Sequence, residues 1–380
     1  SIAILVFPKL GWGEFSHIYL FLTIEDLWQL GKTNKSAFVA FLKEKSFRKS
    51  ATFKNLVNAK GDAWSVNFLP YLSVHEKVAL VSYPRCGNTF LRKLLETSTG
   101  IVTGSDNRPN RILSSSLLSY GFQGEGVTDN SVWIVKSHFP ERLGYIHVHA
   151  NRAIVLIRNP FDAIESYFHM GMTNTHNRNL TDKAFDSLTT IWESFVRNEA
   201  QVWVDYYQYW LNQASQLPLL FIRYEDLLMN AEKQLSYIFS FLCEGKAPSR
   251  FYSFYQKKSH HLAVDDSKGY TPRQSGGNVG KGLQRMSEGQ VQAILNAASS
   301  MMLQFGYKME ENGSCEKSLS VDGFDPVTFS DSLNKGKKNS GYLKVNEKVS
   351  IRKESDMYGR KITELRHSHT CKDTKPFDVV

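Results

Sequence analysis

Four short apolar runs are the feature that most constrains how this chain folds. Each run is rich in aliphatic residues, and stretches with helical periodicity separate it from the next. Such runs are typical of parallel strands that helices cover on both faces. The pattern therefore predicts an α/β fold of three layers, with a parallel central sheet flanked by helices. The expected strands are Val78–Ser82, Val132–Lys136, Ala153–Arg158 and Leu219–Arg223.

The composition narrows the class of ligand. The chain has 380 residues and a net charge of +9, which suits an anionic ligand or an acidic surface. No nucleic-acid recognition motif accompanies this charge, so we expect no nucleic-acid partner. No run reaches the roughly 18 apolar residues that a membrane helix needs. The four cysteines are scattered without a C-x-x-C pair, and no histidine cluster stands at zinc spacing, so we expect no disulfide scaffold and no metal site.

The expected strands and helices fall within residues 75–309, which we interpret as one domain. Within it, Trp192–Leu211 repeats apolar residues at helical spacing and predicts a core-facing helix. Residues 1–74 predict a helical or irregular N-terminal extension. Residues 310–380 are dominated by Lys, Ser, Asp and Asn, which predicts a mobile polar tail. Because the first residue is Ser1 rather than Met, we expect the natural N-terminus to lie upstream.

The turn after the first expected strand predicts an anion site. A strand-to-helix turn presents free backbone N–H groups and the positive end of the helix dipole. Gly87 lets the backbone approach an anion, and Asn88 and Thr89 add polar groups. Arg85 adds a permanent charge with a bidentate geometry. The turn lacks the Gly-Lys-Ser/Thr sequence with which kinases hold magnesium, which favours a metal-free phosphate or phosphosulfate. An ordinary polar turn is the alternative.

Lys136 and His138 stand two residues apart at the end of the second expected strand. Because strand side chains alternate, the two should point to the same side. A neutral histidine is suited to take a proton from a hydroxyl, and a lysine beside it can neutralise a leaving group. A purely structural histidine is the alternative.

A third segment, Arg158 to Ser166, predicts a second phosphate site. Asn159 is a good N-cap, and Pro160 suits the first helical position. Arg158 then stands at a strand end, with Ser166 two turns into the helix. We expect these two side chains to hold a phosphate separate from the one at residues 85–89.

Together these segments resemble the sulfotransferases that use 3′-phosphoadenosine 5′-phosphosulfate (PAPS). The resemblance covers about residues 75–307 and implies the P-loop NTPase-like sulfotransferase fold, PAPS as the donor, and no metal. The matched motifs, in the family's order, are Tyr83-Pro-Arg-Cys-Gly-Asn-Thr-Phe90, Lys136-Ser-His138, Arg158-Asn-Pro-Phe-Asp-Ala-Ile-Glu-Ser166 and Tyr224-Glu-Asp226.

The resemblance implies a role for each matched residue. His138 becomes the catalytic base, with Lys136 and Arg85 stabilising charge at the sulfuryl group. The family's late R-K-G-x-x-G-x-W loop is matched only in part and without its tryptophan. The residues expected to bind the donor are Arg85, Cys86, Gly87, Asn88, Thr89 and Phe90 of the turn, Arg158 and Ser166 at the 3′-phosphate, Tyr224 at the adenine, and Arg273, Gly277 and Gly280 of the late loop.

Two residues of the turn depart from the family's pattern. Arg85 replaces a lysine, which keeps the charge but moves it onto a longer, planar head, so catalysis could be slower. Cys86 replaces a serine, a stronger hydrogen-bond donor. A helix N-terminus can lower the pKa of such a thiol, while a small buried residue is the alternative.

We therefore expect sulfuryl transfer from PAPS to a hydroxyl or amine. The rivals are a catalytically inactive sulfotransferase-like nucleotide-binding protein and, less favoured, a P-loop kinase. The segment Thr99–Ser105 and Asn88 resemble the WSC-domain type of carbohydrate sulfotransferase, which implies a glycan or small hydroxylated acceptor. The polar segments Gly104–Asn130 and Met170–Thr190 should select it. The compartment is open: Golgi lumen or membrane if an anchor precedes this chain, and cytoplasm otherwise.

Overall fold

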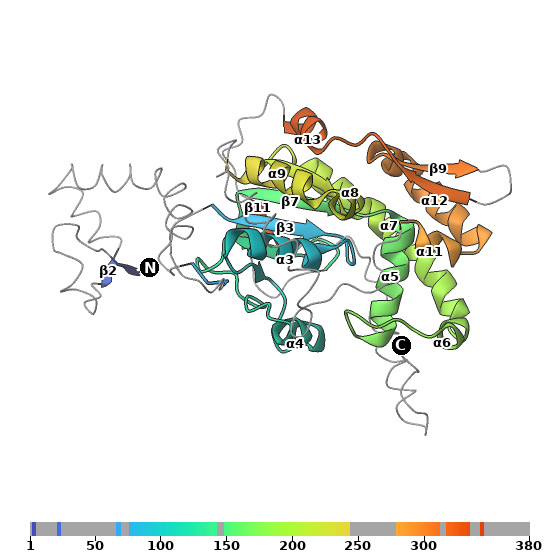
Figure 1. Cartoon of the computed structure of the whole chain (residues 1–380), viewed down its shortest axis with the longest axis horizontal. Coiled ribbons are helices and arrows are strands. Elements are labelled where there is room, and N and C mark those ends of the chain that lie inside the picture. Colours follow the sequence, from blue (N-terminus) through green and yellow to red (C-terminus); the bar gives the residue numbers. More distant parts are fainter. Residues whose placement is uncertain are drawn as a thin grey trace, which may run out of the picture.

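A five-stranded parallel sheet forms the centre of the fold, in the order β4-β5-β3-β7-β8 (Figure 1). The computed structural model describes residues 2–4, 21–23, 66–69, 76–142, 148–243, 279–311, 317–334 and 343–345. The sheet confirms the predicted α/β fold, and all four expected strands are present. The strands are β3 (Val78–Ser82), β4 (Gly104–Ser105), β5 (Ile134–Ser137), β7 (Arg152–Ile157) and β8 (Leu219–Arg223).

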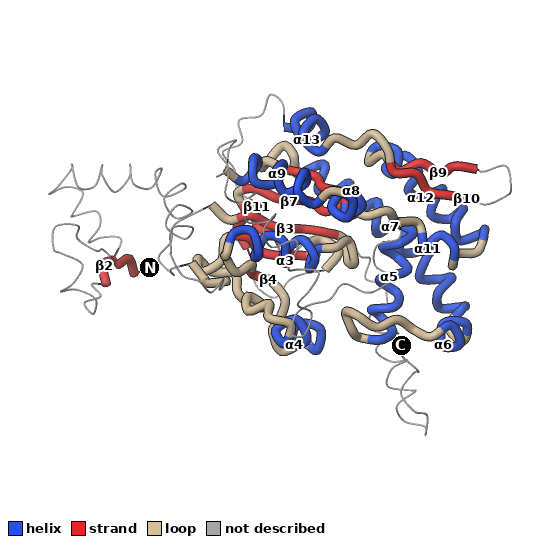
Figure 2. The backbone as a smooth tube through the Cα atoms, viewed as in Figure 1, coloured by secondary structure: helices blue, strands red, loops and turns tan. Residues whose placement is uncertain are grey.

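Helices cover both faces of this sheet (Figure 2). The chain leaves β3 through α3 toward β4 and β5, and leaves β7 through α5 and α7 toward β8. Because such crossovers are right-handed, opposite directions of travel place α3 and the α5–α7 pair on opposite faces. The helices are α3 (Asn88–Thr99), α4 (Ile112–Ser119), α5 (Pro160–Thr173), α6 (Asp182–Asp186), α7 (Thr189–Gln213), α8 (Tyr224–Met229), α9 (Ala231–Leu242), α11 (Lys281–Gln284), α12 (Glu288–Gln304) and α13 (Pro326–Asn334).

The long helix α7 is the core helix that the sequence predicts. Its side chains Trp203, Tyr206, Tyr207 and Trp210 are fully buried. The indole N–H of Trp203 donates to the Arg158 carbonyl over 3.1 Å, and the Tyr207 hydroxyl donates to the Leu156 carbonyl over 2.9 Å. These bonds tie α7 to the end of β7, where the predicted site segment Arg158 to Ser166 begins.

The predicted tail from residue 310 needs correction, because the chain remains part of the fold to Asn334. Strand β9 (Tyr307–Glu311) pairs with β10 (Lys317–Val321), and α13 then packs against β8. The Phe221 N–H donates to Ser330 Oγ over 3.1 Å, and Asn334 Nδ2 donates to the Leu219 carbonyl over 3.1 Å. The polar residues that suggested a mobile tail therefore satisfy the backbone of an edge strand. Residues 346–380 lie outside the described part.

Two small antiparallel pairs complete the description. Strand β6 (Val148–Ala150) pairs with β11 (Leu343–Val345), and β1 (Ile2–Ile4) pairs with β2 (Phe21–Thr23). Residues 66–69 belong to the main domain, since Asn67 bridges Ile101 beside the sheet. Most of the predicted extension 1–74 lies outside the described residues. Of the helices that are described, none has the length and apolar character needed to cross a membrane.

Candidate active site

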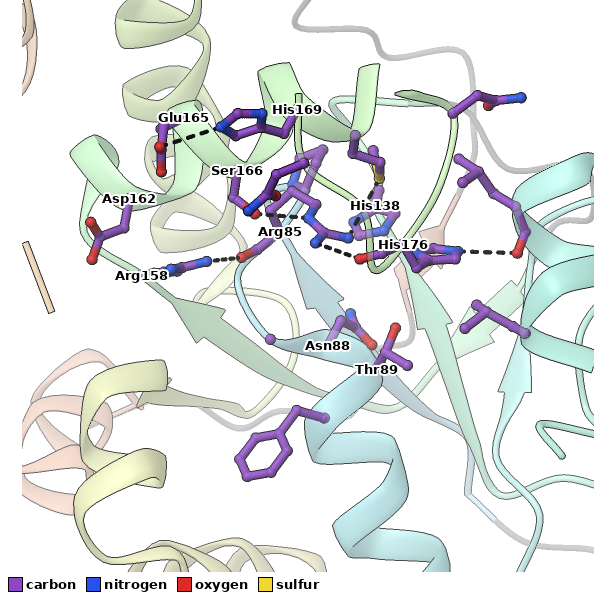
Figure 3. A pocket seen from close by; sticks show the side chains of 18 of the residues that line it. Arg85, Asn88, Thr89, His138, Arg158, Asp162, Glu165, Ser166, His169 and His176 are labelled. Atoms are coloured by element: carbon purple, nitrogen blue, oxygen red, sulfur yellow. Dashed lines mark hydrogen bonds and ion pairs between the residues drawn. The ribbon is translucent and has the colours of Figure 1, made fainter. Parts of the chain in front are cut away.

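A cavity of about 1090 Å³ lies at the carboxyl ends of β3, β5 and β7 (Figure 3). These strands are neighbours in the sheet, so segments far apart in the sequence meet at one edge, as expected for a parallel sheet. The cavity brings together most of the predicted site residues. Those that line it are Arg85, Gly87, Asn88, Thr89, Phe90, Lys136, His138, Arg158, Ser166 and Tyr224.

The turn between β3 and α3 has the shape of an anion-binding loop. Gly87 caps α3 with φ 87°, a conformation that favours glycine. A Cβ at Gly87 would lie 2.2 Å from the Tyr224 ring, so no side chain fits there. Phe90 meets the same ring edge-on, with centroids 6.2 Å apart. Glycine therefore lets the start of α3, with its free N–H groups, face the cavity beside two aromatic rings.

The Arg85 side chain is engaged by the protein itself (Figure 3). Its Nε donates to Ser166 Oγ over 3.0 Å, and its Nη2 donates to the His176 carbonyl over 3.0 Å. Nη1 lies 3.7 Å from the Met170 sulfur. Arg85 and Ser166, which were expected at two separate anion sites, are therefore in direct contact in this structure.

Arg158 retains an unused donor in this cavity. Its Nη1 donates to the Arg85 carbonyl over 2.9 Å, and its guanidinium lies 4.8 Å from the centroid of the Tyr224 ring. Its Nε is buried and has no hydrogen-bond partner among the described residues. Burial by itself would lower the pKa of Arg158, but the nearby Asp162, together with the tyrosine and glutamate that follow β8, raises it. Arg158 is therefore a permanent cation with a free N–H.

His138 is held as a neutral imidazole. Its Nδ1 lies 2.8 Å from the Ser82 carbonyl, and since a carbonyl only accepts, Nδ1 carries the hydrogen. Nε2 is then left with its lone pair. Burial, followed by the positive charges of Lys136 and Arg142, lowers the pKa of His138 to about 3. The ring therefore stays unprotonated at neutral pH, as a proton acceptor requires.

Lys136 presents its ammonium beside His138. The residue is only 4% exposed, and the ammonium forms no hydrogen bond or ion pair within the described ranges. Burial lowers the pKa of Lys136 to about 8, and the nearby Glu125 carboxylate opposes that shift. The cavity therefore holds a buried positive charge without a direct protein partner, which favours an anionic ligand.

Cys86 is the predicted donor-binding residue that the structure places elsewhere. Its side chain is fully buried in the core and does not line the cavity. The sulfur lies 3.4 Å from the Tyr207 hydroxyl. Burial raises the pKa of the thiol to about 12, which favours the small buried residue over a thiol activated by the helix N-terminus. The side chain points under the turn because Arg85 (φ 68°) and Gly87 bend the backbone around it.

The late loop is represented only at its end. Arg273 and Gly277 lie outside the described residues. Gly280 is near the cavity without lining it, and its N–H donates to Asp162 Oδ2 over 2.9 Å. Asp162 also accepts from the Gly282 N–H over 2.7 Å. This carboxylate therefore holds Lys281, which lines the cavity, in place.

Sequence reasoning missed several residues of the site. His176 donates from Nε2 to the Leu113 carbonyl over 3.0 Å and so joins the segment after α5 to α4. Arg142 lines the cavity beside His138, and its Nη2 donates to the Tyr167 hydroxyl over 3.0 Å. None of these residues belongs to a recognisable motif, although His176 falls in a polar segment expected to select the acceptor. Both such segments, 104–130 and 170–190, contribute to the lining.

The fold and the cavity define an α/β domain whose strand-to-helix turn faces a cavity lined by cationic side chains. The family model described as "Sulfotransferase domain" matches residues 75–269, which is more than half of the 380-residue chain. The chain therefore belongs to the sulfotransferase-domain family, and the predicted family is confirmed. In the described part of the chain, no group of three or more His, Cys, Asp or Glu side chains is placed to hold a metal.

Curated relatives match a little under half of the chain. A WSCD family member of Aedes aegypti is 35% identical over 174 residues, covering 44% of this chain and 50% of the relative. Sulfotransferase 1B1 of Mus musculus is 25% identical over 183 residues, covering 43% of this chain and 58% of the relative. The chain thus spans about half the length of these relatives. Among solved structures, mouse sulfotransferase SULT7A1 complexed with PAP aligns with a TM-score of 0.40 at 16% identity, covering 67% of this chain and 90% of that one.

Proposed function

We propose that this protein is a PAPS-dependent sulfotransferase that moves a sulfuryl group from the donor to a hydroxyl or amine of an acceptor. One observation carries the proposal. A histidine with a free Nε2 lone pair, His138, lines the same cavity as the buried ammonium of Lys136 and the unused N–H of Arg158. A proton acceptor beside two fixed cations suits transfer of an anionic group to a protic acceptor.

The residues present fit a donor with two phosphates. Arg158 Nε is a buried donor without a partner in the described part of the chain, and it lies at the end of the cavity nearest Asp162. The turn supplies backbone N–H groups, and the Tyr224 ring, which packs directly on Gly87, lines the cavity as a surface for a base. We propose that Arg158 holds the 3′-phosphate, the turn the 5′ side, and Tyr224 with Phe90 the adenine.

The chain's own residues would do the following. When bound, PAPS supplies the sulfuryl group. His138 would receive the acceptor proton at Nε2, while its Nδ1–H bond to Ser82 fixes the ring. Lys136 would stabilise negative charge that develops as the sulfuryl group leaves. Arg85 would contribute only after it exchanges its bonds to Ser166 and the His176 carbonyl for bonds to an anion.

The acceptor proposed is a carbohydrate. Two observations support this class. The cavity wall near α4 carries Asn107, Asn110 and Arg111, hydrogen-bonding groups suited to a polyol, with Leu113 beside them. Several of the matched relatives are WSCD family members, the type that the sequence motifs resemble.

Two measurements test the function. Titration calorimetry should show binding of adenosine 3′,5′-bisphosphate without magnesium, and labelled sulfate should pass from PAPS to at least one member of a panel of glycans, phenols and amines. Binding without transfer to any acceptor would instead favour the inactive nucleotide-binding protein. Tight binding of Mg-ATP with none of the bisphosphate would overturn the proposal in favour of a kinase.

A further inference from the structure

The tripeptide Gly124-Glu125-Gly126 lies beside β4 at the edge of the central sheet and forms an isolated β-bridge with it. Glu125 forms a parallel bridge with Ser105 of β4. A Cβ at Gly124 would lie 2.2 Å from the Thr103 carbonyl oxygen, so this position accepts only glycine. Gly126 has φ 82°. The two glycines thus let the segment lie against β4, with the Glu125 side chain buried. The sequence had placed this segment among those expected to select the acceptor.

The Glu125 carboxylate meets a buried arginine. Arg92 of α3 donates from Nη1 to Glu125 Oε1, and both side chains are completely buried. Arg92 is fixed in turn by Thr103, whose Oγ1 accepts from Nε over 2.8 Å and whose carbonyl accepts from Nη2 over 3.0 Å. The Phe122 ring covers the guanidinium at 4.9 Å. The guanidinium is therefore held in place, whereas the second carboxylate oxygen of Glu125, Oε2, is buried and has no hydrogen-bond partner among the described residues.

The pair lies directly behind Lys136. Ser105, the bridge partner of Glu125, is also the β4 residue paired with Lys136 of β5. Glu125 is the largest source of negative potential at the Lys136 ammonium. Reciprocally, although burial would raise the pKa of Glu125, Arg92 and then Lys136 hold it below its ordinary value. Carboxylate and ammonium thus belong to residues in register on either side of Ser105, with β4 between the Glu125 segment and β5.

We propose that Glu125, oriented by Arg92, is a positioning residue that keeps the Lys136 ammonium charged at the end of β5 for sulfuryl transfer. This inference rests on the function proposed above. Two buried cations, Arg92 and Lys136, share the one carboxylate, so without Glu125 they would repel each other at close range. The other charged and titratable groups that act on or line the cavity beside Lys136 are Arg85, Asp106, His138, Arg142 and His176.

The test compares wild type with Glu125→Gln, which keeps an acceptor for Arg92 and removes the charge. The pH dependence of Lys136 acetylation by acetic anhydride, followed by peptide mass spectrometry, reports the amine directly. We expect its midpoint to fall by about one pH unit from near 8, because an opposite charge nearby is lost. The alkaline limb of kcat/KM for PAPS should move equally, leaving activity about threefold lower at pH 7.5 and about eightfold lower at pH 8.5.

Two further variants separate positioning from mere stability. Arg92→Met/Glu125→Gln removes both charges of the buried pair. Because Glu125 acts on the Lys136 pKa more strongly than Arg92 does, the labelling midpoint should still fall, by less than in Glu125→Gln. Glu96→Gln is the matched control, since this second buried carboxylate accepts from Thr103 N–H over 2.9 Å and should leave the midpoint unchanged. A destabilised core would move the Glu96→Gln midpoint as well. Melting curves report folding of each variant.

An unchanged Lys136 midpoint in Glu125→Gln, or equal shifts in Glu125→Gln and Glu96→Gln, would overturn the inference. If Glu125→Gln does not fold, the double variant Arg92→Met/Glu125→Gln decides, and a midpoint at or above the wild-type value would overturn it. Failure of the proposed function looks different. Wild type would then transfer no sulfate, while the labelling midpoints would still show whether Glu125 controls the charge of Lys136.

Discussion

The turn after β3 and the end of β5 present positive charge to the same cavity in opposite ways. The Arg85 side chain of the turn already bonds to Ser166 and the His176 carbonyl, whereas the Lys136 ammonium of β5 forms no hydrogen bond to the side chains or backbone of the described residues. An anion that enters the cavity must displace the contacts of Arg85 with Ser166 and the His176 carbonyl. The Lys136 ammonium can bind the anion without losing such a contact. Preorganised charge contributes most to electrostatic catalysis. We therefore expect β5 to stabilise the charge that develops during transfer, and the turn to contribute mainly the backbone N–H groups that bind the donor.

The largest effect should come from His138→Ala. We expect transfer to fall about 10³-fold, because general-base catalysis contributes on the order of 10²–10⁴. Calorimetry should show bisphosphate binding that is nearly unchanged. The matched control is His149→Ala, an exposed histidine on β6 outside the cavity. Retained turnover in His138→Ala would show that His138 is not the general base. It would contradict the view that the end of β5 carries the catalytic groups.

Lys136→Met should reduce kcat by about 10²–10³, as loss of one preorganised charge-stabilising group does. Methionine keeps much of the side-chain volume, so the packing around β5 should survive. Single-turnover transfer measures the step, and Lys93→Met on α3, outside the cavity, is the control. A loss below tenfold would show that the turn, not β5, stabilises the leaving group.

Gly87→Ala tests whether the turn acts through its backbone. Alanine at φ 87° costs about 1–2 kcal/mol by itself, and its Cβ would also strike the Tyr224 ring. We expect at least about tenfold weaker bisphosphate binding, measured by calorimetry. Gly121→Ala is the control for backbone strain without a clash. Gly121 also has a positive φ, 90°, but a Cβ there would meet no other part of the described structure within 4 Å. Equal binding in the two variants would refute a role for Gly87 in shaping the site.

The neutral state of His138 predicts a pH effect on stability. Its folded pKa, lowered to about 3 by burial and cations, lies below the unfolded value of about 6.5. The unfolded chain therefore binds more protons in this window, and stability falls as pH drops from 6.5 toward 3. Urea unfolding at pH 7 and pH 5 should show wild type losing about 2 kcal/mol more than His138→Gln. Equal losses would mean that the ring is not held neutral.

Arg85→Lys should have the smallest effect, a change in kcat/KM below about tenfold. The reason is that the Arg85 guanidinium already donates its hydrogen bonds to Ser166 and the His176 carbonyl. Steady-state transfer measures it, and Arg111→Lys, another cavity arginine, is the reference. A loss of kcat/KM near 100-fold would show that Arg85, like Lys136, stabilises charge during transfer. The contrast between the turn and β5 would then be wrong.

Local patterns were sufficient for the sheet and for the edge where the site lies. The runs that became β3 and β8 were predicted to the residue, because fully buried parallel strands must be apolar along their whole length. Since parallel strands end at one edge, the turn, Lys136 with His138, and Arg158 had to meet there. The sequence by itself therefore determined the fold class, the family, and which polar residues share one cavity.

The tertiary structure alone decided what each of these side chains is free to do. No pattern shows that Cys86 turns into the core, that Arg85 reaches Ser166, or that residues 317–334 satisfy the edge of β8. Nor does any pattern place Glu125 in register with Lys136 across β4, since that placement depends on two glycines that let a loop lie against β4. The physical reason is common to all four: burial and partners come from distant segments, and they set the charge and direction of a side chain.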